Sequence, residues 1–288
     1  MRRRSVIAAL GALGVSGFPW PAAVGAKPTE RPLNLSELEA RHGGRIGLCA
    51  SNGVSRVHWR GPERFAYCST FKLFLAAATL ERVHHGAERL DRAVAIAAKD
   101  MIAHAPVTGP AVGASLTIER LCQSTVEVSD NPAANILIRE MGGLDTWRAW
   151  YRRIGDDVTR VDRWETELNS AIPGDPRDTT TPQQTVANLA TILLSERLSS
   201  AHRRLLESWL IASPTGDGRI KAGVPAGWRV GHKTGTGKTP VNDIGIVWPP
   251  AGAPVLIAVY FTEAHEAPLE SREAVVAEAV RRALQAMN

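Results

Sequence analysis

The amino-acid sequence predicts a mixed α/β protein, with strands near both ends of the chain and helices in the middle. Short strand-like apolar runs lie near both ends, and longer apolar-periodic segments fill the centre. With 44% hydrophobic and 22% charged residues, the 288-residue chain has ample material for a core. The expected strands are Arg45–Ser51, Arg56–Arg60, Arg229–Thr234, Asp243–Trp248 and Val255–Phe261, and the expected final helix is Glu270–Met287.

The first 26 residues are predicted to be a bacterial export signal. Met1-Arg2-Arg3-Arg4 is basic, Ser5 to Phe18 is apolar, and Val24-Gly25-Ala26 supplies the small residues of a cleavage site. The adjacent arginines fit the twin-arginine route as well as the general secretory route. The apolar stretch is short for a membrane span, and no later segment has the required length. We therefore expect a periplasmic protein without stable membrane association after export.

The charge of the chain does not call for a nucleic-acid partner. The formal net charge is +5, but three of these positive charges are arginines of residues 1–26, which contain no acids. The remaining charge of +2 is small, and no basic face or RNA-binding motif accompanies it. We expect no nucleic acid to bind.

Ser69-Thr70-Phe71-Lys72 is the first of several short motifs with chemical potential. The apolar run after Ser69 contains no Gly or Pro and predicts a helix, with Ser and Thr at its start. Residues three apart share a helix face, so the Lys72 amine is expected near the Ser69 hydroxyl and able to activate it. The alternative is a capping serine followed by a surface lysine, but Lys72 lies within an apolar run.

Two further motifs follow in order. Ser129-Asp130-Asn131 precedes Pro132 and an apolar segment, which is also how an ordinary helix begins, so a simple cap is an equal alternative. Lys233-Thr234-Gly235 ends a predicted strand, and its lysine and hydroxyl suit an anionic substrate lying along the strand edge. Taken alone, it is more often a turn with a solvated lysine.

These motifs together resemble the set of the class A β-lactamases and penicillin-binding proteins. The likeness extends to residues 163–182, which resemble the long Ω-loop of class A β-lactamases, and it covers nearly all of the chain after the signal. It implies an antiparallel five-stranded sheet flanked by helices, and an all-helical domain. The implied α/β domain comprises residues 27–60 and 214–288, and the helical domain comprises residues 61–213 with the Ω-loop at 163–178. The active site would lie between the two domains, in a monomer that acts on a small-molecule β-lactam.

The resemblance implies a role for each motif residue. Ser69 would be the acylated nucleophile, Lys72 a candidate base, Ser129 the proton relay, and Glu165 the base that activates the deacylating water. Which of Lys72 and Glu165 starts acylation stays open. The implied substrate contacts are Asn131, Asn169, Lys233, Thr234, Gly235, Thr236, Arg219 and His104. Backbone N–H groups of Ser69 and Thr236 would form the oxyanion hole.

Several implied features are specific to this chain. Arg163 and Asp178 would form an ion pair that fastens the Ω-loop, and the Glu165–Thr166 peptide would be cis although Thr166 is not a proline. Arg219 would reach toward the substrate carboxylate, and His104 would line the mouth of the cleft. The segment Gly237–Val241 looks shorter than usual for the family.

The three cysteines are expected to form no intramolecular disulfide. Cys122 and Cys68 fall at family disulfide positions, but the partner positions hold Ala76 and Gly237. An odd number of cysteines also leaves at least one thiol free or paired between chains.

Three other functions were weighed against β-lactam hydrolysis. A penicillin-binding DD-peptidase or a β-lactam sensor would share Ser69, Lys72, Ser129 and Lys233. Such a protein does not need Glu165 and Asn169, because these two residues serve fast deacylation. A P-loop is disfavoured because His232 replaces its first glycine and Pro240 follows at once. The eight histidines show no zinc-hydrolase spacing, so neither a metal nor a cofactor is expected.

Overall fold

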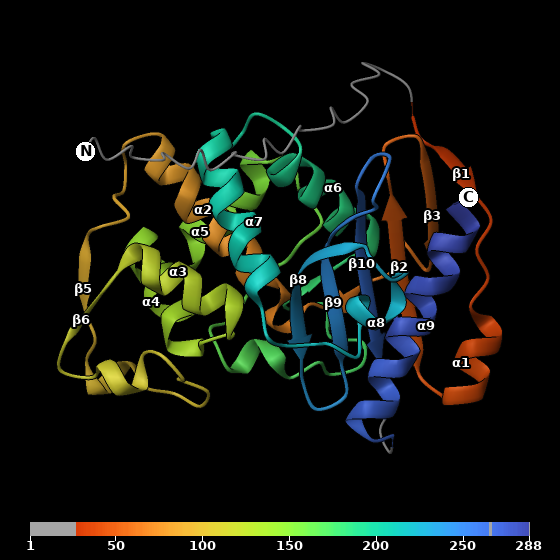
Figure 1. Cartoon of the computed structure of the whole chain (residues 1–288). Coiled ribbons are helices and arrows are strands. Elements are labelled where there is room, and N and C mark those ends of the chain that lie inside the picture. Colours follow the sequence, from red (N-terminus) through yellow and green to blue (C-terminus); the bar gives the residue numbers. More distant parts are fainter. Residues whose placement is uncertain (1–26, 265–266, 288) are drawn as a thin grey trace, which may run out of the picture.

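The computed structural model describes residues 27–264 and 267–287, so the predicted export signal lies outside the described residues. It confirms the mixed architecture, with a sheet on the right of Figure 1 and most helices on the left. The strand order of the main sheet is β1-β3-β2-β10-β9-β8. These strands are β1 (Thr29–Arg31), β2 (Arg45–Ser51), β3 (Ser55–Trp59), β8 (Arg229–Thr236), β9 (Val241–Trp248) and β10 (Val255–Thr262).

The expectation of five strands needs a correction, because the sheet has six. The five predicted strands form the antiparallel part, and β1 adds to its edge by parallel pairing with β3. β1 is only three residues long, is exposed throughout, and lies between Pro28 and Pro32. Prolines are tolerated at sheet edges, where one side of the strand needs no pairing. Such a segment has no apolar alternation from which it could have been predicted.

The central strand β10 is buried on both faces and separates two hydrophobic clusters. Leu256, Ala258 and Tyr260 face one cluster, whereas Ile257 and Val259 face the other. This alternation is the two-residue period of a strand. It explains why residues 255–261 read as a continuous apolar run.

Helices cover both faces of the sheet. α9 (Leu269–Met287) packs against β2, β3, β9 and β10. α1 (Ser36–His42) and α8 (Ile220–Gly223) pack against α9. α6 (Pro182–Leu193) packs on the opposite face against β2 and β10. The other helices are α2 (Phe71–His84), α3 (Ile118–Glu127), α4 (Asn131–Met141), α5 (Leu144–Arg153) and α7 (Ser200–Ala212). The short 3₁₀ turns are η1 (Cys68–Thr70), η2 (Ala98–Asp100), η3 (Gly109–Ala111) and η4 (Glu167–Asn169).

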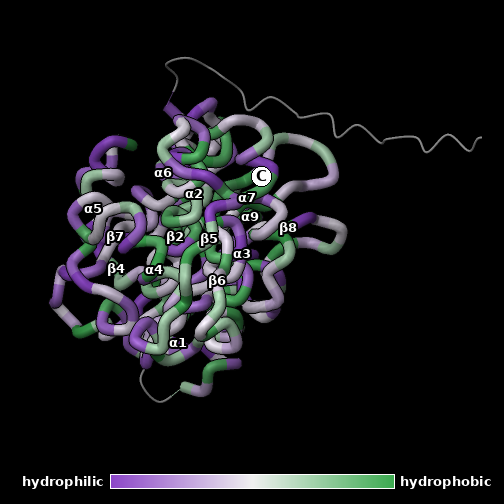
Figure 2. Tube along the Cα trace, turned by 90° about the vertical axis from the view of Figure 1, so that its left-hand side faces the viewer, coloured by the Kyte–Doolittle hydropathy of each residue, from purple (hydrophilic) through white to green (hydrophobic). Residues whose placement is uncertain are grey.

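The helix α2 runs through the core of the helical part. Every residue from Phe71 to Glu81 is buried, and most of them are apolar, which fits a helix surrounded by the core. In Figure 2 the hydrophobic stretches concentrate toward the centre of the molecule, and the hydrophilic stretches lie mainly along its outline. A polar side chain on the first turn of α2 is therefore surrounded by protein.

Two small ribbons complete the fold. β4 (Phe65–Ala66) pairs with β7 (Thr179–Thr180), and β5 (Ala93–Ala95) pairs with β6 (Ser115–Thr117). The β4–β7 pairing joins the chain just before η1 to the chain just after residue 178. The loop 163–178 is thereby held beside the start of α2.

The P-loop alternative does not fit this fold. Residues 235–239 form the end of β8 and the turn into β9, with the Gly237 N–H bonded to the Pro240 carbonyl at 3.0 Å. A phosphate-binding loop would run into a helix at this point. The division of the chain into domains at residues 61 and 213 stays a prediction. Among the described helices, none combines the length and the apolar character needed to cross a bilayer.

We predict that Gly47→Ala destabilises the protein by about 1–3 kcal/mol through overpacking. A methyl group on Gly47 in β2 would lie 2.3 Å from Cε2 of Phe65, whose ring stacks on Tyr260. Urea denaturation measures the change. The control is Gly109→Ala, because the added methyl would have an ordinary contact of 3.5 Å with Ala105. Equal stability of the two variants would contradict the tight packing of β2 on Phe65.

Candidate active site

Ser69 lies in η1, directly before α2 and deep in the structure. Its side chain is 9% exposed, and the preceding Cys68 has a positive φ of 47°. Such a backbone conformation is unfavourable for a residue with a side chain and persists only where the surroundings hold it. The Ser69 hydroxyl donates a hydrogen bond to Oε1 of Glu165 at 3.3 Å.

Lys72 is the centre of the polar cluster. Its Nζ lies 2.9 Å from Oε1 of Glu165, and both side chains are fully buried. It also donates to the carbonyl of Ser129 at 2.9 Å, to the Ser129 hydroxyl at 3.2 Å, and to Oδ1 of Asn131. The sequence predicted that the Lys72 amine lies near the Ser69 hydroxyl, but the amine contacts Glu165, Ser129 and Asn131. Ser69 and Lys72 are linked through their shared partner, Glu165.

Glu165 is positioned by two asparagines. The backbone N–H of Glu165 donates to Oδ1 of Asn135 at 3.0 Å, and Nδ2 of Asn135 donates to the Glu165 carbonyl at 2.9 Å. Nδ2 of Asn169 donates to Oε2 of Glu165 at 2.5 Å. The Glu165 carboxylate therefore faces Lys72 and Ser69 with one oxygen and Asn169 with the other. The Glu165–Thr166 peptide is cis, as predicted.

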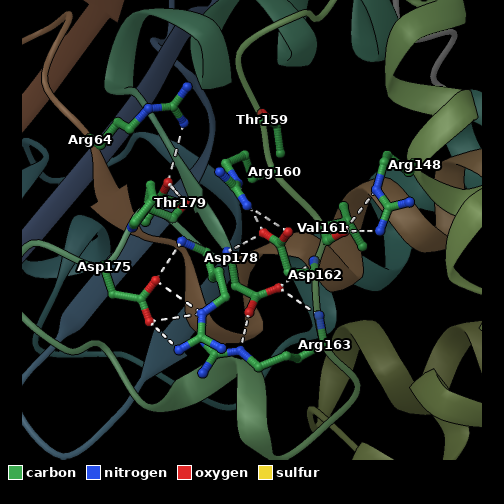
Figure 3. A network of polar contacts seen from close by, with 12 residues as sticks. Arg64, Arg148, Thr159, Arg160, Val161, Asp162, Arg163, Asp175, Asp178 and Thr179 are labelled. Atoms are coloured by element: carbon green, nitrogen blue, oxygen red, sulfur yellow. Dashed lines mark hydrogen bonds and ion pairs between the residues drawn. The ribbon is translucent and has the colours of Figure 1, made fainter.

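The ends of the loop 163–178 are fastened by the predicted ion pair. Nε of Arg163 lies 2.6 Å from Oδ2 of Asp178, and the Asp178 side chain is fully buried (Figure 3). The other oxygen of Asp178 accepts the N–H groups of Asp162 and Arg163 and the hydroxyl of Tyr67. Because this carboxylate receives both charge and hydrogen bonds, it is a firm anchor for a loop with little regular structure.

The strand β8 supplies the facing wall of the site. Lys233 is fully buried, and its Nζ donates to the Thr234 carbonyl at 2.8 Å. No ion pair joins it to a carboxylate among the described residues. The Thr234 hydroxyl shares a hydrogen bond of 3.0 Å with Thr215. Gly235 lies against η1, since a Cβ there would be 2.7 Å from the Tyr67 carbonyl and 3.1 Å from the Thr70 nitrogen.

Arg219 and His104 have other contacts than the sequence suggested. The buried Arg219 guanidinium pairs with Glu273 at 2.9 Å and donates to the Asn242 carbonyl and to the Thr236 hydroxyl, both at 2.8 Å. It thus holds the end of β8, where Thr236 lies. The exposed His104 ring is 2.8 Å from the Val128 carbonyl, so it fastens the loop before α4.

One positioning residue, Asn135, was missed by the sequence analysis, and Asp130 makes more contacts than the cap that its motif offered. Asp130 is fully buried, caps α4 through the Ala133 N–H, and accepts the N–H groups of Val107 and Thr108. The cap interpretation of its motif was thus right for Asp130, while Ser129 and Asn131 contact Lys72. Asn135 lies one helical turn after Asn131, and that spacing on one helix face was the available signal.

Burial lowers the pKa of both lysines. For Lys72 the loss of hydration lowers the pKa, and the nearby Glu165 partly offsets this. For Lys233 the pKa lies well below the ordinary value of 10.5, because of burial and then the charge of Lys72. Desolvation also raises the pKa of the Cys68 thiol to about 12, so this cysteine next to the nucleophile is itself unreactive. All three cysteines are buried free thiols.

The described residues contain no group of three or more His, Cys, Asp or Glu side chains that could hold a metal ion. The site offers hydroxyls, a carboxylate, two buried amines and several amides close to one another. This set can form and hydrolyse a covalent acyl intermediate on Ser69.

Comparisons with known proteins point to one family. The model of the "Beta-lactamase enzyme family" matches residues 33–287. The chain is 37% identical to beta-lactamase FAR-1 of Nocardia farcinica, over all of this chain and 95% of that protein. It is 41% identical to the carbapenem-hydrolyzing beta-lactamase KPC of Klebsiella oxytoca, over 88% of this chain and 87% of that protein. The solved structure of an ancestral class A beta-lactamase superposes with a TM-score of 0.84 at 49% identity, covering 88% of this chain and 98% of that one.

We predict that Arg163→Met lowers the free energy of unfolding by about 3 kcal/mol, because it leaves the buried Asp178 without its partner. Limited proteolysis should then cut within residues 163–178 faster than in the wild type. The matched control is Arg177→Met, which breaks a pair with Asp175 in the same loop, where the arginine side chain is 48% exposed. It should change neither measurement appreciably. If the two variants behaved alike, Arg163 would not be the residue that fastens the loop.

Proposed function

The chain belongs to the beta-lactamase enzyme family as a class A serine β-lactamase, which hydrolyses β-lactam rings and confers resistance to these antibiotics, and from this premise we propose roles for its residues. Ser69 is the nucleophile, Glu165 and Lys72 accept and pass on its proton, and Ser129 relays a proton to the leaving nitrogen. The observation that carries this proposal is the contact of one Glu165 oxygen with both the Ser69 hydroxyl and the Lys72 amine.

In acylation, Ser69 Oγ attacks the β-lactam carbonyl carbon and transfers its proton. The hydrogen bond from the Ser69 hydroxyl to Glu165 supports Glu165 as the first acceptor of this proton. Lys72 contacts both Glu165 and the Ser129 hydroxyl, so it connects the acceptor to the relay. As the ring C–N bond breaks, Ser129 gives a proton to the nitrogen and regains one through Lys72.

The developing oxyanion is proposed to bind the backbone N–H groups of Ser69 and Thr236. The close packing of Gly235 on η1 supports this, because it brings the end of β8 against the turn that carries Ser69. Donors fixed by the fold need not reorganise as charge develops.

In deacylation, Glu165 removes a proton from water, and the resulting hydroxide attacks the ester carbonyl. Asn169 binds the second Glu165 oxygen and is placed to hold the same water. The two hydrogen bonds from Asn135 fix the backbone of Glu165, so that the carboxylate keeps its position between water and ester. This part of the site distinguishes a β-lactamase from a DD-peptidase or a sensor.

Substrate recognition is assigned to β8 and to Asn131. Lys233 and Thr234 receive the substrate carboxylate, since the Lys233 amine is buried and makes a single hydrogen bond among the described residues. Gly235 and Thr236 line the strand edge, and Asn131 contacts the acylamide side chain. We propose that Arg219 acts through its hydrogen bond to Thr236 and that His104 acts by holding the cleft mouth.

Penicillins and cephalosporins are the proposed substrates. An extension to carbapenems rests on the 41% identity to a relative named as carbapenem-hydrolyzing, and imipenem hydrolysis by the purified protein tests it. We also propose that the chain is exported through its first 26 residues, acts as a monomer in the periplasm, and needs no cofactor.

We predict three distinct outcomes with nitrocefin and intact-mass measurement. Wild type turns over, and Ser69→Ala is inactive and gains no mass. Glu165→Gln accumulates an acyl adduct, because deacylation slows about 100- to 10 000-fold while Lys72, which loses its carboxylate partner, still serves as a base for acylation. Asn135→Ala should slow deacylation to a smaller extent, since the carboxylate remains. Turnover by Ser69→Ala would refute the proposal. Rapid loss of the adduct in Glu165→Gln would instead show that another group activates the water.

We predict that kcat/KM for benzylpenicillin falls on the alkaline side at a pH below the ordinary lysine pKa of 10.5. The Lys233 pKa is lowered, so raising the pH through that value removes the charge that binds the substrate carboxylate. The decline should be about tenfold per pH unit. Lys233→Arg keeps its charge over this range and should move the decline to higher pH. An unchanged profile in Lys233→Arg would assign the decline to another group.

A further inference from the structure

A basic hollow lies at the base of the loop 163–178, apart from the catalytic cleft. It has a volume of about 360 Å³ and is lined by Arg64, Arg148, Arg152, Asp157, Val158, Arg160, Val161 and Asp162. The arginines come from three places: the chain before β4, the helix α5, and the segment that leads into the loop. None of these lining residues belongs to the active site described above. Figure 3 shows Arg64, Arg148 and Arg160 around this part of the chain.

The guanidinium groups are fixed in place but retain free donors. Arg148 donates twice to the Val161 carbonyl, at 3.0 and 2.8 Å, and Arg152 donates to the carbonyls of Asp156 and Thr159. Arg64 donates to the Val158 carbonyl at 2.9 Å. Each guanidinium has five N–H donors, and these bonds use only part of them. The side chains of Arg148, Arg152 and Arg160 are also 42%, 37% and 41% exposed.

The acids that line the hollow are fewer than its arginines. Four arginines face two lining acids, Asp157 and Asp162. Asp162 accepts hydrogen bonds from Arg160 and from the Asp178 N–H. Asp157 is 90% exposed and comes no closer than 4.0 Å to Arg152. From outside the lining, Asp145 pairs with Arg148 at 2.6 Å, and the buried Asp156 lies 3.9 Å from Arg152. The residues that line the hollow therefore carry more positive than negative charge, and they present several forked donors.

We infer that this hollow binds a small soluble oxyanion of the diphosphate class. Forked guanidinium donors match phosphate oxygens, and several of them converging on one hollow suit an anion with more than one phosphoryl group. Such an anion would bridge α5 to the segment 160–162. That segment bonds to the anchor of the loop, since the Asp162 N–H donates to Asp178 at 2.8 Å.

The first test measures binding of inorganic pyrophosphate by calorimetry, at low ionic strength, to wild type, Asp157→Asn and Asp91→Asn. Asp157→Asn removes an acid from the hollow and should tighten binding by about three- to tenfold, as expected for one nearby charge in water. Asp91→Asn changes the total charge equally, but Asp91 pairs with Arg89 and does not line the hollow, so it should bind as wild type does. Equal effects of the two variants, or no binding at all, would overturn the inference.

The second test locates the anion. Arg160→Gln should weaken pyrophosphate binding while circular dichroism shows an unchanged fold, since Asp162 keeps the Asp178 N–H as a partner. Lys233→Met should bind as wild type does. Binding that survives Arg160→Gln but is lost in Lys233→Met would place the anion in the catalytic cleft and refute the assignment. Phosphatidylglycerol vesicles should not compete with pyrophosphate, and competition at equal phosphate concentration would mean that the hollow serves a lipid surface.

Discussion

The buried contact between Lys72 and Glu165 is the interaction on which the rest of the structure depends. Both side chains are removed from water, and burying two charges is costly unless they are paired and hydrogen-bonded. The surroundings meet this condition, because Ser129 and Asn131 accept from Lys72 while Ser69 and Asn169 donate to Glu165. The partners that solvate the pair are the groups proposed to act in the reaction. The same contacts therefore stabilise the buried charges and position the reactive atoms.

Glu165 must be brought to Ser69 across 96 residues of sequence, and a loop with little regular structure beyond the short turn η4 does this. Such a loop lacks the hydrogen-bond ladder of a helix or strand, so local contacts have to replace it. Asp178 closes the loop by accepting from Arg163 and Tyr67, the β4–β7 pairing fixes its exit, and Asn135 fixes the backbone at Glu165 itself. The polar side chains of the loop are therefore structural elements, and the position of the catalytic carboxylate depends on them.

The sequence predicted those parts of the molecule that rest on local pattern or on contiguous motifs. The strands of β2, β8, β9 and β10 follow from apolar runs, and the four catalytic candidates do meet in one cluster. Gly237 lies next to Cys68, as the family disulfide position implied, since a Cβ on Gly237 would be 3.3 Å from the Cys68 sulfur. What the sequence analysis did not find depends on contacts that no local pattern encodes. β1 is defined by its neighbour β3, and the contact of Arg219 with Glu273, 54 residues away, has no signal in the sequence.

Two buried lysines in one cleft raise the question of why the fold tolerates them. Lys72 has Glu165 as a partner, whereas within the part of the chain that the structure describes Lys233 donates only to a backbone carbonyl. The charge of Lys72 further disfavours protonation of Lys233. A residue selected for stability alone would not remain in this position, because its desolvation is incompletely compensated. A substrate carboxylate supplies the missing partner, so substrate binding offsets the desolvation cost of Lys233 that the free protein leaves uncompensated. The anionic substrate thus completes an electrostatic arrangement that the protein alone leaves unfinished, and this favours carboxylate-bearing ligands over neutral ones of similar shape.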